Sequence, residues 1–288
     1  MHISVGLTGI AMVAFAANSL LCRMALANTT IDPGLFTAIR LISGAVCLLT
    51  LVFMSNKNWL RPSFALQNIA RQTSVVGAIC LFVYALGFSY AYISMSTGTG
   101  ALLLFGAVQI TMITRGLVSG ERFRLLQWIG FLLAFTGLVI LLLPGASAPP
   151  FISAVLMISA GVAWGVYSLI GKKSTAPLLL STGNFVLASV LIIPLIVWLA
   201  LTSTWQWNTQ GALYGLASGM LASGLGYAIW YKALPLLHST TAATVQLSVP
   251  VIATAMGWMF LGEVIGLQII IASIMSLGGI WLVIAKRA

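Results

Sequence analysis

The chain alternates between long apolar stretches and short polar connections along nearly its whole length. A helix that crosses a bilayer needs about 20 mainly apolar residues. Cutting the sequence at its charged and turn-forming clusters gives stretches of about this length. They are 4–26, 33–54, 72–92, 96–115, 123–143, 151–171, 178–201, 210–232, 239–260 and 264–285. The pattern therefore predicts an all-α membrane protein with ten transmembrane helices.

The composition leads to the same class of protein. Hydrophobic residues make up 60% of the chain and charged residues 6%, whereas soluble domains carry about 25% charged residues. The net charge of +10 does not indicate nucleic-acid binding, because the basic residues stand at the ends of apolar stretches. We expect the lipid bilayer and a small-molecule substrate as partners, and no nucleic acid; the oligomeric state stays open.

The basic residues fall on one face of this arrangement. All 13 Lys and Arg residues except Arg23 and Arg40 lie in or beside connections on the same side. These are Lys57, Arg61, Arg71, Arg115, Arg122, Arg124, Lys172, Lys173, Lys232, Lys286 and Arg287. Cytoplasmic connections carry an excess of Lys and Arg. We therefore expect both termini in the cytoplasm and a protein integral to the bacterial inner (cytoplasmic) membrane.

The chain also contains two similar halves. Two of its 3 acidic residues, Glu121 and Glu263, each follow a glycine, and almost half of the chain separates them. The stretch "FAANSLLCR" at 15–23 resembles "WGVYSLIGK" at 164–172, with an aromatic residue, a central Ser-Leu and a basic end. These matches indicate an internal repeat.

The repeat is predicted to be inverted in the membrane. Residues 1–145 form the first unit and residues 146–288 the second, and each holds five predicted helices. Because five is odd, the two units enter the membrane from opposite sides. Inverted repeats are typical of secondary transporters, whose substrate site lies near the midplane between the repeats. We expect a central cavity there.

These features together resemble a known family. The ordered set consists of the Gly-Glu pairs at 120–121 and 262–263, the run "SVPVIATAMGWMFLGE" at 248–263 and the closing "GGIWLVI" at 278–284. With two halves of similar length, the chain resembles the drug/metabolite transporter superfamily, specifically its ten-helix EamA-type exporters. The resemblance implies two inverted five-helix units around a central cavity. It also implies export of small metabolites, often amino acids.

Few charged groups are available inside the bilayer, where such groups are costly and are functional candidates by default. Arg40 lies about eight residues into its predicted helix, and it either pairs with a backbone carbonyl or lines the cavity. Lys232 and His238 are the other charged or titratable candidates. Glu121 and Glu263 are expected to open helices, where a carboxylate meets the positive end of the dipole, or to form a gate contact at each face.

The remaining chemistry is sparse. Asp32 precedes Pro33, a pair that predicts a helix N-cap followed by the first helical residue. Cys22, Cys47 and Cys80 lie in apolar stretches and are interpreted as packing residues. We expect no metal and no cofactor. No acidic residue falls at mid-membrane, so we expect weak or no obligatory proton coupling.

Aromatic and small polar side chains are the candidates for lining the cavity. The set is Phe15, Asn18, Ser19, Tyr84, Phe88, Gln109, Trp164, Tyr167, Ser168, Tyr227, Trp230, Tyr231 and Gln246. The alternative is that they face lipid or form interfacial belts. A lining without carboxylates suits neutral or zwitterionic substrates with an apolar part. Their carboxylate could lie against a helix N-terminus such as 97–100.

The sequence thus favours an exporter of small metabolites, above all neutral or aromatic amino acids, that works by alternating access. One alternative is a carrier of sugar phosphates, nucleotide sugars or drugs on the same fold; phosphorylated substrates would need Arg40 and Lys232 as a cation pair. An intramembrane enzyme has little support, because no catalytic residues can be assigned and nucleophiles need a positioned base.

Overall fold

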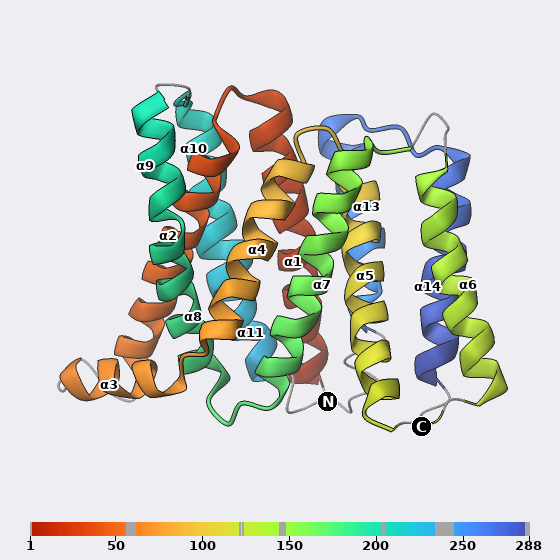
Figure 1. Ribbon diagram of the computed structural model, residues 1–288, viewed down its shortest axis with the longest axis horizontal. Coiled ribbons are helices and arrows are strands. Elements are labelled where there is room, and N and C mark those ends of the chain that lie inside the picture. The colour runs from red at the N-terminus through yellow and green to blue at the C-terminus, as the bar shows by residue number, and fades with distance from the viewer. Residues whose placement is uncertain are drawn as a thin grey trace.

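The computed structural model describes residues 2–55, 62–120, 122, 124–143, 148–202, 205–233 and 245–285. Over these residues every regular element is a helix, and they run mostly side by side (Figure 1). They are α1 (His2–Asn28), α2 (Pro33–Met54), α3 (Pro62–Gln72), α4 (Val75–Ala91), α5 (Thr97–Val118), α6 (Leu125–Leu142), α7 (Phe151–Lys172), α8 (Pro177–Leu191), α9 (Ile193–Thr202), α10 (Thr209–Ala217), η2 (Ser218–Leu225), α11 (Gly226–Ala233), α13 (Ser248–Leu261) and α14 (Leu267–Ala285).

The described helices have the length and composition of membrane spans. Of these residues, 7 helical segments are long and apolar enough to cross a bilayer, with α8 and α9 counted as one segment and α10, η2 and α11 as another. The bent pair α3 and α4 would make an eighth, and α13 and α14 are shorter apolar helices. The prediction of an all-α membrane protein is confirmed at this level.

Helix α3 lies where the sequence pattern left a connection between two spans. It makes an angle of 81° with α4 and runs along the lower end of the molecule (Figure 1). Within α3, Ala65 and Ile69 are buried, whereas Phe64 and Leu66 are exposed. An amphipathic helix of this kind is too polar to be found by searching for long apolar stretches.

Two predicted spans are not continuous α-helices. The stretch 178–201 divides into α8 and α9 beside Pro194, which cannot donate a backbone hydrogen bond. The stretch 210–232 contains η2, a π-helix of 8 residues between α10 and α11. Short π-helical segments occur frequently at functional sites. Neither break was predicted, because each stretch is apolar enough over its whole length to be taken for one span.

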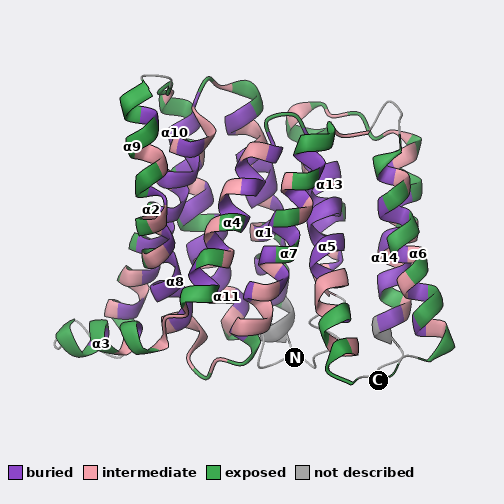
Figure 2. Cartoon of the chain, in the orientation of Figure 1, coloured by how far each residue is buried: buried purple, intermediate pink, exposed green. Residues whose placement is uncertain are grey.

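The closest packing joins helices from the first part of the chain to helices from the second. Helix α6 packs on α14, α4 and α5 pack on α7, α2 packs on η2 and α8, and α1 packs on α13 and α11. Buried residues are concentrated where these helices meet, and exposed residues on the outward faces (Figure 2). The core therefore lies between the two parts of the chain.

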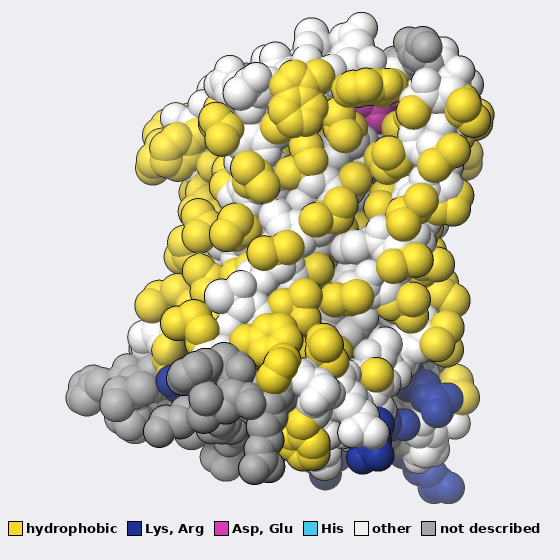
Figure 3. Space-filling model, turned by 90° about the vertical axis from the view of Figure 1, so that its left-hand side faces the viewer, with side chains coloured by type: hydrophobic (Ala, Val, Ile, Leu, Met, Phe, Trp, Pro, Cys, Tyr) yellow, Lys and Arg dark blue, Asp and Glu magenta, His cyan; other side chains and the backbone are white. Residues whose placement is uncertain are grey.

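The surface separates apolar from charged groups. Hydrophobic side chains cover the middle of the face shown in Figure 3, and Lys and Arg side chains gather at its lower end. The lower end is where α1 begins and α5, α7 and α14 end; the upper end is where α1 ends and α5 begins (Figure 1). At the upper end, the predicted cap is confirmed: Asp32 Oδ1 accepts hydrogen bonds from the backbone N–H of Gly34 and of Leu35, with Pro33 as the first helical residue.

Candidate functional site

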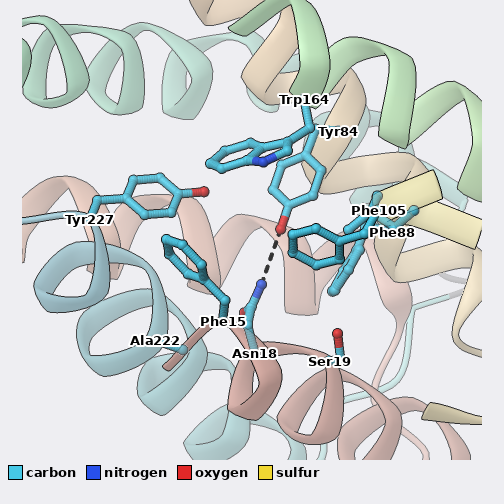
Figure 4. A pocket seen from close by; sticks show the side chains of 10 residues that line it. Phe15, Asn18, Ser19, Tyr84, Phe88, Phe105, Trp164, Ala222 and Tyr227 are labelled. Carbon is cyan, nitrogen blue, oxygen red and sulfur yellow. Dashed lines mark hydrogen bonds between the residues drawn. The ribbon is translucent and has the colours of Figure 1, made fainter. Parts of the chain in front are cut away.

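One cavity lies at about half the depth of the helix bundle, where α1, α4, α5, α7, η2 and α11 approach one another (Figure 4). Its lining consists of Phe15, Asn18, Ser19, Tyr84, Phe88, Leu104, Phe105, Trp164, Ala222 and Tyr227. The cavity has a volume of about 20 Å³. That is enough for a water molecule and too little for an amino acid.

Helical spacing explains how these side chains meet. Phe15, Asn18 and Ser19 stand at i, i+3 and i+4 on α1, and Tyr84 and Phe88 at i and i+4 on α4. Residues with this spacing share one face of a helix. Both faces are turned toward the space between the helices, so two stripes on separate helices form opposite sides of one cavity (Figure 4).

Aromatic rings form most of the wall. The ring centroids of Tyr84 and Trp164 are 4.9 Å apart, and those of Trp164 and Tyr227 are 5.1 Å apart. Phe15 meets Tyr227 edge-on at 5.8 Å, and Phe88 lies 5.3 Å from Tyr84. Such ring surfaces suit an apolar or aromatic part of a substrate, and their faces also attract cations.

The polar side of the cavity is organised by Asn18. Its Nδ2 donates to the Tyr84 hydroxyl at 3.1 Å, and its Oδ1 accepts from the Ser218 hydroxyl at 2.6 Å. These bonds connect α1 with α4 and with the first residue of η2. The Ser19 hydroxyl also lines the cavity, and its oxygen is buried without a hydrogen bond of good geometry.

Arg40 lies behind the aromatic wall. Its guanidinium carbon is 5.5 Å from the ring centroid of Tyr84 and 5.1 Å from that of Phe88. Nη2 donates to the carbonyl oxygen of Ala85 at 3.0 Å, so the expected pairing with a backbone carbonyl is present. Arg40 is only 2% exposed and is not among the residues that touch the cavity directly.

The other candidate residues occupy different places. Gln109 is buried in α5, Ser168 donates to the Trp164 carbonyl of its own helix, and the Tyr167 hydroxyl donates to Ser181. Lys232 is exposed at the end of α11, away from the buried Arg40. None of these residues is among those that line the cavity, and the same holds for Trp230, Tyr231 and Gln246. His238 and Glu121 lie outside the described residues.

Three lining residues were not among the sequence candidates: Leu104, Phe105 and Ala222. Leu and Ala carry no chemical signal that separates cavity lining from core or lipid contact. Phe105 follows a run of leucines, and its apolar side chain did not distinguish it from the rest of the helix core. Tertiary packing alone determines their position.

A second polar group, the Glu263 cluster, joins Arg23, Tyr92, Ile93, Thr97 and Glu263 at the upper end. The expectation that Glu263 opens its own helix is wrong, because α14 begins only at Leu267. Both oxygens of the Glu263 carboxylate instead accept from the backbone N–H of Thr97, at 3.0 and 2.8 Å. The carboxylate thus meets the positive end of the dipole of α5.

Arg23 completes this cluster. Its Nε lies 3.4 Å from Glu263 Oε1, and its Nη1 donates to the carbonyl oxygens of Tyr92 and Ile93 at 2.9 and 2.8 Å. The cluster therefore ties the end of α1 and the α4–α5 connection to the segment after α13. Gly262, with φ of +63°, makes the turn that directs Glu263 back toward α5.

A bundle of apolar helices with an internal cavity between its two parts is typical of membrane transport proteins. A family comparison agrees: the EamA-like transporter family model matches residues 3–143 and 151–285. The chain belongs to this family.

Individual relatives extend the comparison. The chain is 49% identical to PA1977 of Pseudomonas aeruginosa over 98% of its own length and 94% of that protein. It is 28% identical to the transporter YwfM of Bacillus subtilis, covering 84% of this chain and 80% of YwfM. It is 31% identical to the threonine/homoserine exporter RhtA of Salmonella typhimurium, over 51% of each chain. A solved crystal structure shares the fold, with a TM-score of 0.63, 19% identity and 98% coverage of both chains.

Proposed function

We propose that this protein exports neutral or aromatic amino acids by alternating access. The observation that carries the proposal is the cavity lining, which combines aromatic rings in mutual contact with Asn18 and Ser19 and contains no carboxylate. Rings accommodate an apolar side chain, and the amide and hydroxyl groups can hydrogen-bond the polar end of an amino acid. The name of RhtA, a threonine/homoserine exporter, agrees with this substrate class.

We further propose ten spans arranged as two inverted repeats. The 7 segments that are long and apolar enough to cross a bilayer are counted first. Adding α4, α13 and α14 as one span each gives the ten spans of the proposal. The packing also fits an exchange of the two halves: α4 on α7 has its counterpart in α11 on α1, and α5 on α7 in α13 on α1. This exchange is what a two-fold axis in the membrane plane would produce.

The same proposal assigns the lower end to the cytoplasm. Arg71, Arg115, Lys172, Lys173 and Lys232 stand at helix ends there, as the positive-inside rule requires. Both termini then lie in the cytoplasm of a bacterial inner membrane.

In this orientation the Glu263 cluster closes the outer face. It connects the two halves through an ion pair and through hydrogen bonds to a helix N-terminus. Since the cavity below is small, we infer that an amino acid enters it when the outer face opens. Opening the outer face requires that Glu263 separate from Thr97 and Arg23. We propose that Glu121 serves the inner face in the same way.

The lining gives less support to phosphorylated substrates. A phosphate dianion would call for paired cations, and Lys232 is exposed whereas Arg40 is buried. The absence of a carboxylate from the lining also favours transport that does not depend on protons.

Uptake of labelled amino acids into proteoliposomes tests the proposal, with a panel that includes L-threonine and L-phenylalanine. We expect saturable uptake of neutral amino acids that is the same with and without an imposed pH gradient. Accumulation driven by the gradient would contradict proton independence. Uptake no greater than in protein-free liposomes would contradict amino-acid transport.

A further inference from the structure

Arg40 is a cation within the membrane-spanning part of the chain, and no described residue neutralises it. It stands seven residues after the first residue of α2, about 10 Å along the helix. The acidic residues that the structure describes are Asp32 and Glu263. Asp32 caps α2, and Glu263 pairs with Arg23 and with Thr97. The positive charge of Arg40 is thus uncompensated over the described residues.

Its hydrogen bonding is also incomplete. Nη2 donates to the Ala85 carbonyl, but Nη1 is buried and has no hydrogen-bond partner. A buried donor without an acceptor is unfavourable, and more so when it is charged. A buried positive charge without a counter-ion makes the electrostatic potential of the space around it positive.

The position of Arg40 relates this charge to the cavity. Its guanidinium lies against the rings of Tyr84 and Phe88, and both of these residues also line the cavity. The charge therefore lies close to the cavity without touching it. In a medium of low dielectric constant, a cation at that distance favours an anion over a neutral group by about tenfold or more.

The other place for a substrate anion is already filled. The N-terminus of α5 was a candidate for binding a carboxylate, but the Glu263 carboxylate accepts the Thr97 N–H there. Ser19, which lines the cavity and whose oxygen lacks a well-formed hydrogen bond, supplies a donor inside it.

We propose that Arg40 makes the cavity a site for substrates that carry a carboxylate. The carboxylate lies on the Tyr84–Phe88 side, within reach of the Ser19 hydroxyl and attracted by the Arg40 guanidinium. An ammonium group and the apolar part then face Trp164 and Tyr227, whose ring faces attract cations. This inference rests on the proposed amino-acid export and names the group that the site recognises. It excludes amines that lack a carboxylate.

The first test uses the wild-type, full-length protein and needs no variant. Thermal unfolding in detergent is measured with L-phenylalanine, L-phenylalaninamide and phenethylamine, which share one side chain. The same comparison is made with L-threonine and L-threoninamide. We expect the apparent Kd of each acid to be at least about tenfold lower than that of its amide or amine. Equal affinities, or binding of none of the five compounds, would overturn the proposal.

Variants of Arg40 test whether this residue causes the preference for acids over amides and amines. Arg40→Gln is expected to remove the difference between acid and amide, and Arg40→Lys to retain most of it because the charge remains. Arg71→Gln is the matched control, since Arg71 is exposed at the end of α3. A preference that survives in Arg40→Gln would exclude Arg40 as its cause. If Arg40→Gln fails to fold, the wild-type ligand series still decides whether the site recognises carboxylates.

Transport measurements separate this proposal from amino-acid export itself. Preference for the acid in binding, without uptake into proteoliposomes, would contradict export and leave carboxylate recognition standing. Uptake of L-phenylalanine and phenethylamine with equal KM values would contradict carboxylate recognition and leave export standing.

Discussion

At the scale of single residues, Asn18 is the point at which the polar contacts of the cavity converge. It donates to Tyr84 and accepts from Ser218, so one amide connects three helical segments. Inside a bilayer few water molecules are available to replace a lost partner. An amide at this position therefore holds the geometry of the site as well as supplying a polar surface.

Replacing Asn18 with Leu tests this role. The Asn18→Leu variant leaves the Tyr84 and Ser218 hydroxyls without these partners, at a cost of about 1–3 kcal/mol for each buried group left unpaired. We expect the initial rate of amino-acid uptake into proteoliposomes to fall at least tenfold. Thr136→Ala is the control, because the exposed Thr136 bonds only to the Leu132 carbonyl of its own helix. Equal uptake by Asn18→Leu and Thr136→Ala would show that Asn18 is not needed.

At the scale of elements, small residues determine how closely the helices approach. On the contact between α6 and α14, a Cβ added to Gly130 would lie 2.6 Å from the Gly279 carbonyl oxygen. Conversely, a Cβ on Gly279 would lie 2.5 Å from the Gly130 carbonyl oxygen. The two backbones touch, as is usual where glycines pack membrane helices.

Adjacent glycines on α14 provide a matched test of this packing. In Gly279→Ala the new methyl group meets backbone atoms that cannot rotate away, and we expect a destabilisation of about 1–3 kcal/mol. Gly278→Ala places its methyl in open space and should be neutral or slightly stabilising. Thermal unfolding of the two purified variants makes the comparison. Equal unfolding temperatures would contradict direct backbone contact between α6 and α14.

The sequence predicted the positions of the long apolar helices better than the places where the helices are interrupted or lie across the bundle. Every apolar stretch in the described part of the chain is largely helical, because length and hydrophobicity suffice to specify a membrane span. Helix α3 was not predicted because it is too polar to be recognised as a span, and the π-helix η2 was not predicted because it does not interrupt its apolar stretch. In the cavity, Phe15, Asn18 and Tyr84 were found because aromatic and polar residues mark one helix face. Ala222 and Leu104 carry no such mark.

At the scale of the whole molecule, the Glu263 cluster is a charged contact that joins the two parts of the chain at the upper end. Its ion pair connects residues 240 positions apart in sequence. Because the same carboxylate also caps α5, one group binds both a side chain and a helix terminus.

Glu263→Gln removes the charge from both contacts, so we expect the outer face to open more often. Cys22, which is 0% exposed and adjacent to Arg23, reports this opening in a Cys47→Ala, Cys80→Ala background. A membrane-impermeant maleimide should label Cys22 several-fold faster in the Glu263→Gln variant. Gln268→Ala is the control, because Gln268 binds carbonyls of Ile140 and Leu143 at the same end without a charge. Equal labelling rates in both variants would contradict a gating role for Glu263.

The orientation of the whole chain gives a further prediction. With an even number of spans and basic residues toward the cytoplasm, the two ends of the chain lie on the cytoplasmic side. A reporter that is active only in the periplasm should therefore be silent when fused after Ala288. The same reporter inserted between residues 148 and 150 should be active. Activity after Ala288 would contradict the proposed number of spans or their direction.

The small size of the cavity affects how fast the protein can work. The cavity volume is about 20 Å³. Because an amino acid is larger than this, we expect it to bind only after helices move apart. Collective motions of helices take microseconds to milliseconds, so we expect turnover to be no faster than these motions. The apparent affinity is also weakened in proportion to the fraction of time spent open. We therefore expect slow turnover and modest affinity. Both follow from a cavity that stays closed between transport cycles and so prevents leakage across the membrane.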